Sequence, residues 1–179
     1  PILAATLLVD GVSTLHNVPD ISDVHTFLGI LETLGAKTTF ANGTVTVDAT
    51  NAKPAHIAHD QVKKMRASIL VLGPILGRFG EVQLAFPGGC VLGKRSIGAH
   101  IHALSALGAE IIESTDDIHL KGKLRATKII MTESSVTATE NALMAAVKAE
   151  GETEIRWAAM EPHVQDLCKF LVKMGAKIE

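Results

Sequence analysis

One short pattern occurs three times along the chain, as Leu34-Gly35-Ala36-Lys37, Leu107-Gly108-Ala109-Glu110 and Met174-Gly175-Ala176-Lys177. Each copy follows a stretch in which apolar residues recur every three or four positions, the spacing of an amphipathic helix. A glycine directly after such a stretch suits the left-handed conformation that commonly ends a helix. Because these glycines are 73 and 67 residues apart, the chain is predicted to be a threefold structural repeat.

A second set of glycines divides each repeat in the same way. Gly11, Gly80 and Gly151 each follow a helical pattern and precede a short strand pattern. The sequence therefore predicts first helices over residues 2–9, 67–78 and 139–150, and strands over 12–17, 81–86 and 152–157. The second helices are predicted over residues 22–34, 97–107 and 164–174.

A hairpin is predicted to complete the first two repeats. Ala41-Asn42-Gly43 lies between two β-branched runs, and Asn-Gly is a strong signal for a tight hairpin turn. The second repeat has runs at 110–113 and 118–120, and further strands are predicted at 56–58 and 128–131. The unit is β-α-β-α-β-β, so we expect an α/β fold with apolar helices inside and sheets outside. The expected units are about 1–50, 51–125 and 126–179.

Both ends of the chain interrupt this pattern. The chain begins at Pro1-Ile2-Leu3, inside an apolar helix with no leading strand and no capping residue. It ends at Ile178-Glu179, inside the first strand of a third hairpin. We therefore expect a domain that is truncated at both ends.

Composition excludes several classes of function. With 17 basic and 19 acidic residues the chain has no broad basic field for nucleic acid, and aromatic side chains for base stacking are scarce. No apolar run is long enough to span a membrane, and the start lacks the basic leader of a signal peptide. Two cysteines cannot make a disulfide framework. These features predict a cytoplasmic protein that binds neither nucleic acid nor membrane.

The second repeat contains a segment that the others lack. Its two glycines are 28 residues apart, against 24 in the other repeats, and the excess falls on Pro87–Arg95. This segment holds three glycines, Cys90, Lys94 and Arg95. Cations beside a cysteine favour its thiolate and attract phosphate, so the segment is interpreted as a place where a thiol meets an anion. A loose glycine turn with an uninvolved cysteine is the alternative, and the insertion into a regular frame favours function.

The segment and its neighbours resemble a known family. Pro87-Gly88-Gly89-Cys90, with Gly93 and Arg95, resembles the reactive-cysteine loop of UDP-N-acetylglucosamine enolpyruvyl transferases. Three further stretches match in order along the chain: Met65-Arg66-Ala67-Ser68 with Gly73-Pro74, Ser135-Val136-x-Ala138-Thr139-Glu140-Asn141, and Glu161-Pro162. The resemblance implies an inside-out α/β barrel domain of three β-α-β-α-β-β repeats. The family has two such domains, which implies that a partner domain is absent here.

The resemblance also implies a reaction and a set of site residues. Such enzymes transfer enolpyruvyl from phosphoenolpyruvate to UDP-N-acetylglucosamine, the first committed step of peptidoglycan synthesis. Cys90 matches the proton donor, which also forms an adduct with phosphoenolpyruvate and is alkylated by fosfomycin. Arg66 and Arg95 match arginines that meet the substrates, and Ser135 and Val136 match contacts to the UDP-sugar. No metal or other cofactor is implied, and the isolated domain is expected to be inactive.

Some residues depart from the family pattern or allow another interpretation. Gly98 replaces an aspartate associated with uracil, Glu133 a lysine and Thr137 a glycine, so a non-catalytic sugar-nucleotide-binding or interaction module is the alternative function. Arg66 is otherwise a solvated cation and Ser135 an ordinary helix cap. The remaining polar candidates are weaker: His56 with His59 as a metal pair, His100 as an orienting residue, and Cys168 as a core residue.

Overall fold

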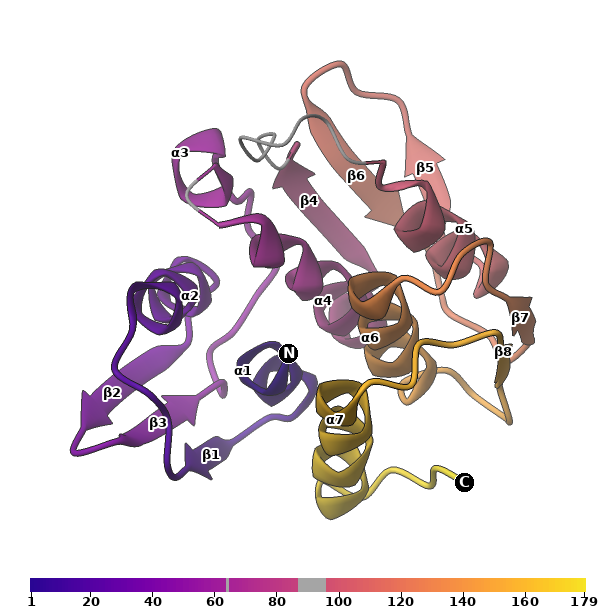
Figure 1. Ribbon diagram of the computed structural model, residues 1–179. Helices are drawn as coiled ribbons and strands as arrows, with labels where there is room; N and C mark the ends of the chain where they lie inside the picture. Colours follow the sequence, from indigo (N-terminus) through magenta and orange to yellow (C-terminus); the bar gives the residue numbers. More distant parts are fainter. Residues whose placement is uncertain (64, 87–95) are drawn as a thin grey trace.

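Helices occupy the middle of the molecule and three small sheets lie around them (Figure 1). This arrangement is seen in a computed structural model that describes residues 1–63, 65–86 and 96–179. The predicted α/β fold, with helices inside and sheets outside, is confirmed.

The first repeat contains one antiparallel sheet. It runs through α1 (Ile2–Ala5), the 3₁₀-helix η1 (Thr6–Leu8), β1 (Val12–Leu15), α2 (Ser22–Thr33), β2 (Lys37–Ala41) and β3 (Thr44–Asp48). The last strand, β3, lies between β1 and β2 and pairs antiparallel with both. Asn42 and Gly43 have φ angles of 50° and 70°, the left-handed values that a two-residue hairpin turn of type I′ needs. The predicted hairpin is confirmed.

The second repeat has the same strand arrangement. Its elements are α3 (His59–Val62), the 3₁₀-helix η2 (Arg66–Val71), α4 (Leu72–Phe79), β4 (Glu81–Ala85), α5 (Gly98–Ala106), β5 (Glu110–Ile112) and β6 (Asp117–Lys121). Again the last strand, β6, lies between the other two. The strand predicted at 56–58 is reduced to a single parallel bridge between Ile57 and Leu84.

The third repeat contains a parallel strand pair. It runs through β7 (Lys128–Ile130), α6 (Val136–Ala146), β8 (Glu154–Arg156) and α7 (Pro162–Lys173). Helix α6 begins three residues before the predicted position and ends four residues before it. A groove of about 1000 Å³ separates β8 from residues 175–179. The two sides of this groove correspond to β1 and β2 in the first repeat and to β4 and β5 in the second. In those repeats a third strand, β3 or β6, lies between the two and pairs with both.

The three quoted glycine patterns end α2, α5 and α7 in one common geometry. Gly35, Gly108 and Gly175 have φ angles of 87°, 104° and 103°. In each case the N–H of the alanine that follows the glycine donates to the carbonyl of the leucine five residues earlier, at 3.0–3.1 Å: Ala36 to Leu31, Ala109 to Leu104 and Ala176 to Leu171. The glycine N–H makes the shorter companion bond, so each end is a Schellman motif.

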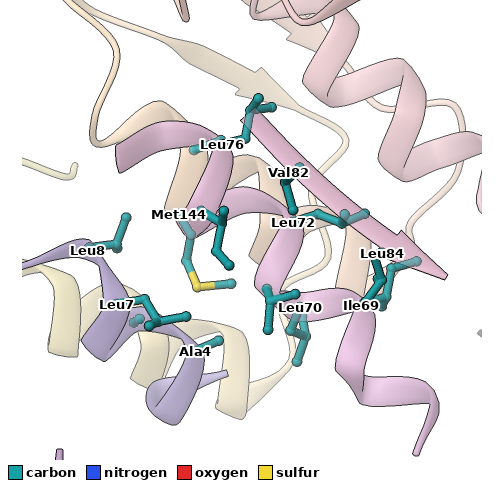
Figure 2. Close-up of a cluster of buried hydrophobic side chains, with 14 of the residues drawn as sticks. Ala4, Leu7, Leu8, Ile69, Leu70, Leu72, Leu76, Val82, Leu84 and Met144 are labelled. Atoms are coloured by element: carbon teal, nitrogen blue, oxygen red, sulfur yellow. The ribbon is translucent and has the colours of Figure 1, made fainter. Parts of the chain in front are cut away.

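The core is built from helices of all three repeats. Figure 2 shows Leu7 of the first repeat, Leu72 and Leu76 of α4, and Met144 of α6 gathered in one cluster, all fully buried. Burying a side chain of this size contributes about 1.5–3 kcal/mol, so the shared cluster couples the repeats into one unit. The predicted apolar face of α2 also enters the core through Phe27, Leu28, Leu31 and Leu34.

Helices α4 and α6 approach each other so closely that one position admits only glycine. A Cβ atom on Gly73 would lie 2.4 Å from the backbone oxygen of Asn141, closer than real contacts allow. The Gly73 N–H donates instead to Oδ1 of Asn141 at 2.7 Å. This crossing brings the polar residues of α6 against the start of α4.

Candidate functional site

Asn141 is a fully buried amide at the centre of a polar network between three helical segments. Its Oδ1 accepts from the Gly73 N–H, and its Nδ2 donates to the Ile69 carbonyl at 2.9 Å. The second hydrogen of Nδ2 points to Nδ1 of His100, also at 2.9 Å. Every hydrogen-bonding atom of the amide is thereby used, which fixes η2, α4 and α5 relative to α6.

The network also determines the protonation of His100. Because Nδ1 accepts from an amide, the neutral ring carries its proton on Nε2, which donates to Oγ1 of Thr137 at 3.2 Å. Burial, together with the nearby charge of Arg66, lowers the pKa of His100 to about 4. The imidazole is therefore neutral at physiological pH and holds α5 against the first turn of α6, as an orienting residue would.

Arg66 lies at the first position of η2 and is half-buried. Its Nη2 donates to the carbonyl of Ser96 at 3.3 Å, which ties η2 to the segment just before α5. A guanidinium has five donors in a planar fork, and this bond uses one of them. Arg66 can therefore bridge Ser96 and an anion in front of it.

Ser135 and Val136 lie at the N-terminus of α6. Ser135 is the cap residue, and its Oγ accepts from the Ala138 N–H at 3.4 Å, so the helix-capping interpretation is correct for its hydroxyl. Val136 is the first residue of the helix. The N-terminus of an eleven-residue helix carries partial positive charge and free N–H groups, which favour an anion. Thr137, the next residue, receives the His100 bond described above.

Two of the predicted site residues, Cys90 and Arg95, lie outside the residues that the structure describes, as does Lys94. The residues that flank the 87–95 segment are described. Phe86 follows β4, and its N–H donates to the carbonyl of Asp116. On the other side, Oγ of Ser96 accepts from the Gly98 N–H at 2.9 Å at the start of α5. Of the two flanking residues, Phe86 therefore lies at the end of β4, and Ser96 lies beside Arg66 and α5.

Sequence reasoning missed Asn141 and Glu140 as site residues, although both stand in the quoted motif. Glu140 is 1% exposed, and its Oε1 has no hydrogen-bond partner among the described residues. Burial raises the pKa of its carboxyl, against the attraction of His163. The sequence feature that could have identified them is a run of polar residues, Thr139-Glu140-Asn141, inside an otherwise apolar helix.

The weaker candidates lie elsewhere. His56 bonds Oδ1 of Asp117 at 3.2 Å, and within residues 1–63, 65–86 and 96–179 no three acidic, histidine or cysteine side chains are placed to hold a metal. Cys168 is half-buried and lines the groove beside β8, so its assignment to the core was wrong.

None of the described helices is both long enough and apolar enough to cross a membrane. A second hollow, of about 820 Å³, lies between α5 and the β5–β6 hairpin, and its described lining includes neither Arg66 nor Ser135.

Known proteins match this chain along its whole length. The family model for EPSP synthase (3-phosphoshikimate 1-carboxyvinyltransferase) matches residues 1–179. The chain belongs to the EPSP synthase family. Within this family it is 50% identical over 183 residues to the UDP-N-acetylglucosamine 1-carboxyvinyltransferase of Chlorobium limicola, covering 100% of this chain and 43% of that protein. A protein of the same name from the Wolbachia of Brugia malayi is 48% identical over 188 residues, with 44% of its length covered.

Solved structures agree with the family's fold. The enolpyruvyl transferase NikO from Streptomyces tendae superposes with a TM-score of 0.85 at 22% identity, covering 99% of this chain and 42% of that one. EPSP synthase from Acinetobacter baumannii gives a TM-score of 0.71 at 18% identity, over 92% of this chain and 40% of that one. The resemblance to enolpyruvyl transferases is thereby confirmed. The chain spans less than half the length of the relatives that it matches.

Proposed function

We propose that this chain is one domain of an enzyme that transfers enolpyruvyl from phosphoenolpyruvate to UDP-N-acetylglucosamine. The observation that carries the proposal is the identity of about 50%, over the entire chain, to proteins named for that reaction. The geometry supports it. The Asn141–His100 network and the bond from Arg66 to Ser96 bring Arg66, Ser96 and the N-terminus of α6 together, as a site for phosphate-bearing substrates requires.

The proposed roles follow from the chemistry of the transfer. Protonation of the methylene carbon of phosphoenolpyruvate makes the adjacent carbon electrophilic, so that a sugar hydroxyl can add there and give up its own proton. Phosphate and one proton of the new methyl group then leave, which restores the double bond of the enolpyruvyl group. A thiol with an ordinary pKa near 8.5 is still protonated at neutral pH and can donate that proton, which is the role we assign to Cys90. Arg95 and Arg66 bind phosphate charge, and Ser135 and Val136 contact the UDP-sugar. Fosfomycin is expected to alkylate Cys90.

The proposal includes the wider setting of the reaction. The three repeats, about 1–50, 51–125 and 126–179, form one domain, and a second domain closes over the substrates. The transfer therefore needs both domains, and this chain alone does not complete it. The reaction is the first committed step of peptidoglycan synthesis in the cytoplasm, and through the cell wall it supports cell shape and division.

A chimera tests the proposal with a complete pair of domains. This chain replaces the region that it matches in the Chlorobium limicola relative, and phosphate release is measured with both substrates. We expect release only when phosphoenolpyruvate and UDP-N-acetylglucosamine are both present. Cys90→Ala should lower the rate by about 10²–10⁴-fold, the usual contribution of general acid catalysis. Cys168→Ala, at the other cysteine, should leave it unchanged.

The result that overturns the proposal is a folded chimera that releases no phosphate while the parent enzyme does. If that chimera still binds UDP-N-acetylglucosamine, the chain is the non-catalytic binding module of the alternative interpretation. Circular dichroism and the thermal midpoint of the chimera show whether it is folded.

A further inference from the structure

Trp157 has a backbone conformation that its side chain disfavours. Its φ angle is 59°, in the left-handed region, which bulky residues rarely adopt. The equivalent residue of the first repeat is Asn17, because each lies six residues after its glycine, Gly11 or Gly151. Asn17 has the same φ, 58°, and asparagine tolerates that region well. The first and third repeats thus share this turn, and the unusual feature is tryptophan at this position.

The loop that carries Trp157 is fastened at one end to the segment that leads into α6 and at the other end to the first turn of α6 itself. On one side the carbonyl of Arg156 accepts from the Met131 N–H at 3.0 Å. On the other side the Ala159 N–H donates to Oγ1 of Thr139 at 3.0 Å. Residues 131 and 139 enclose Ser135 and Val136, so Trp157 lies opposite the segment that contains the proposed sugar-nucleotide contacts. Figure 1 shows the two connections, from β7 to α6 and from β8 to α7, leaving neighbouring strands.

The position also has the general character of a ligand site. Strands β7 and β8 are parallel, and Trp157 directly follows the carboxyl end of β8. Crevices beyond the carboxyl ends of parallel strands are where α/β sheets bind ligands. Trp157 is 65% exposed, so the strained backbone does not bury its ring in the core. Strained residues of this kind cluster at active sites and ligand sites.

We propose that the indole of Trp157 is a stacking platform for the uracil ring of the sugar nucleotide. The inference rests on the proposed function, because it takes UDP-N-acetylglucosamine as the ligand. An indole offers a wide, rigid π-face, and stacking on a base requires no hydrogen-bonding pattern. The ring supplies affinity for the base, while Arg66 and the N-terminus of α6 meet the diphosphate.

The chain allows a direct optical test, since Trp157 is its single tryptophan and it has no tyrosine. Emission excited at 295 nm is followed while the 179-residue protein is titrated with UDP-N-acetylglucosamine. N-acetylglucosamine 1-phosphate, which has no base, is the comparison ligand. We expect the sugar nucleotide to quench the emission and the comparison ligand to leave it unchanged.

Two variants measure the contribution of the ring by calorimetry. Trp157→Asn copies Asn17, so it removes the ring and keeps a residue that suits the backbone. It should weaken binding of UDP-N-acetylglucosamine on the order of tenfold to a hundredfold, the range found for loss of one base-stacking aromatic. Trp157→Phe retains a ring and should recover most of that loss. Neither change should alter binding of N-acetylglucosamine 1-phosphate.

The outcomes separate this inference from the proposed function. Equal affinity of wild type and Trp157→Asn for UDP-N-acetylglucosamine overturns the stacking role and leaves the proposed function standing. An equal loss for both ligands also overturns it, because the ring then supports the fold and not the base. No binding of UDP-N-acetylglucosamine by the wild-type protein overturns the inference, whereas phosphate release by the chimera decides the proposed function separately.

Discussion

Burial holds the imidazole of His100 neutral, and this single ring gives the protein a defined pH dependence. Its pKa is lowered from 6.5 to about 4 in the folded protein, first by burial and then by the charge of Arg66. Between these values the unfolded chain binds the proton and the folded protein does not. The stabilisation that comes from keeping His100 neutral is therefore fully present above pH 6.5. As the pH falls from 6.5 towards 4, the free energy of unfolding decreases by at most about 1.4 kcal/mol per pH unit.

His100→Gln tests this account at the same position. Glutamine cannot take up the proton, and its amide can still accept from Asn141 or donate to Thr137. We expect the variant to be less stable than wild type at pH 7.5 and to lose less stability between pH 6.5 and 4. Urea unfolding at several pH values measures both quantities. Parallel pH profiles for the two proteins would show that His100 is not the titrating group.

At the scale of elements, the crossing of α4 over α6 depends on the absence of a side chain at Gly73. The added methyl of Gly73→Ala would meet the backbone oxygen of Asn141, which cannot rotate away. The helices must separate, which stretches the Gly73–Asn141 bond and loosens the network around His100. We expect a loss of about 1–3 kcal/mol in the free energy of unfolding, the range for overpacked cores.

Gly29→Ala in α2 is the matched control for Gly73→Ala. A Cβ atom there meets nothing within 4 Å, and Gly29 lies in the interior of α2. This change should stabilise the protein by about 0.5–1 kcal/mol, because alanine loses less conformational entropy on folding. Denaturation of both variants by urea provides the comparison. A similar effect at the two positions would contradict a close α4–α6 contact.

At the scale of the whole molecule, three equivalent helix ends stand in different surroundings. Gly35 and Gly175 share left-handed φ angles and the same Schellman hydrogen bonds. The backbone at Asn51 packs against Gly35, so a Cβ atom on Gly35 would lie 2.7 Å from the carbonyl oxygen of Asn51. A Cβ atom on Gly175 would have no atom within 4 Å. The two positions therefore separate local backbone strain from contacts between distant segments.

Alanine at these two positions should have unequal effects. Gly175→Ala incurs the left-handed penalty alone, about 1–2 kcal/mol. Gly35→Ala incurs the same penalty and also displaces the backbone at Asn51, so its loss should be clearly larger. Thermal unfolding of the two variants measures the difference. Equal losses would mean that the backbone at Asn51 moves aside at no cost in free energy, and that local geometry alone determines these helix ends.

The sequence by itself determined the local elements and their threefold order. Helix ends at Gly35, Gly108 and Gly175, the Asn42-Gly43 turn and the apolar face of α2 depend on neighbouring residues, and all were predicted correctly. The limits of the first helices were predicted less well. The helix over 67–78 begins as a 3₁₀-helix, and α6 ends at Ala146, because packing between repeats decides where such helices stop.

Only the tertiary structure decided how the polar residues meet. Asn141 bonds to residues 41 to 72 positions away in the sequence, and no local pattern encodes that pairing. The motif pointed to Ser135 and Val136, but not to the buried amide and imidazole that hold them beside Arg66. Likewise, the sequence shows a tryptophan at position 157, whereas its left-handed backbone and exposure follow from a turn clamped between β7 and α6. Periodicity is local and can be read from one chain, while a binding site requires segments brought together by the core.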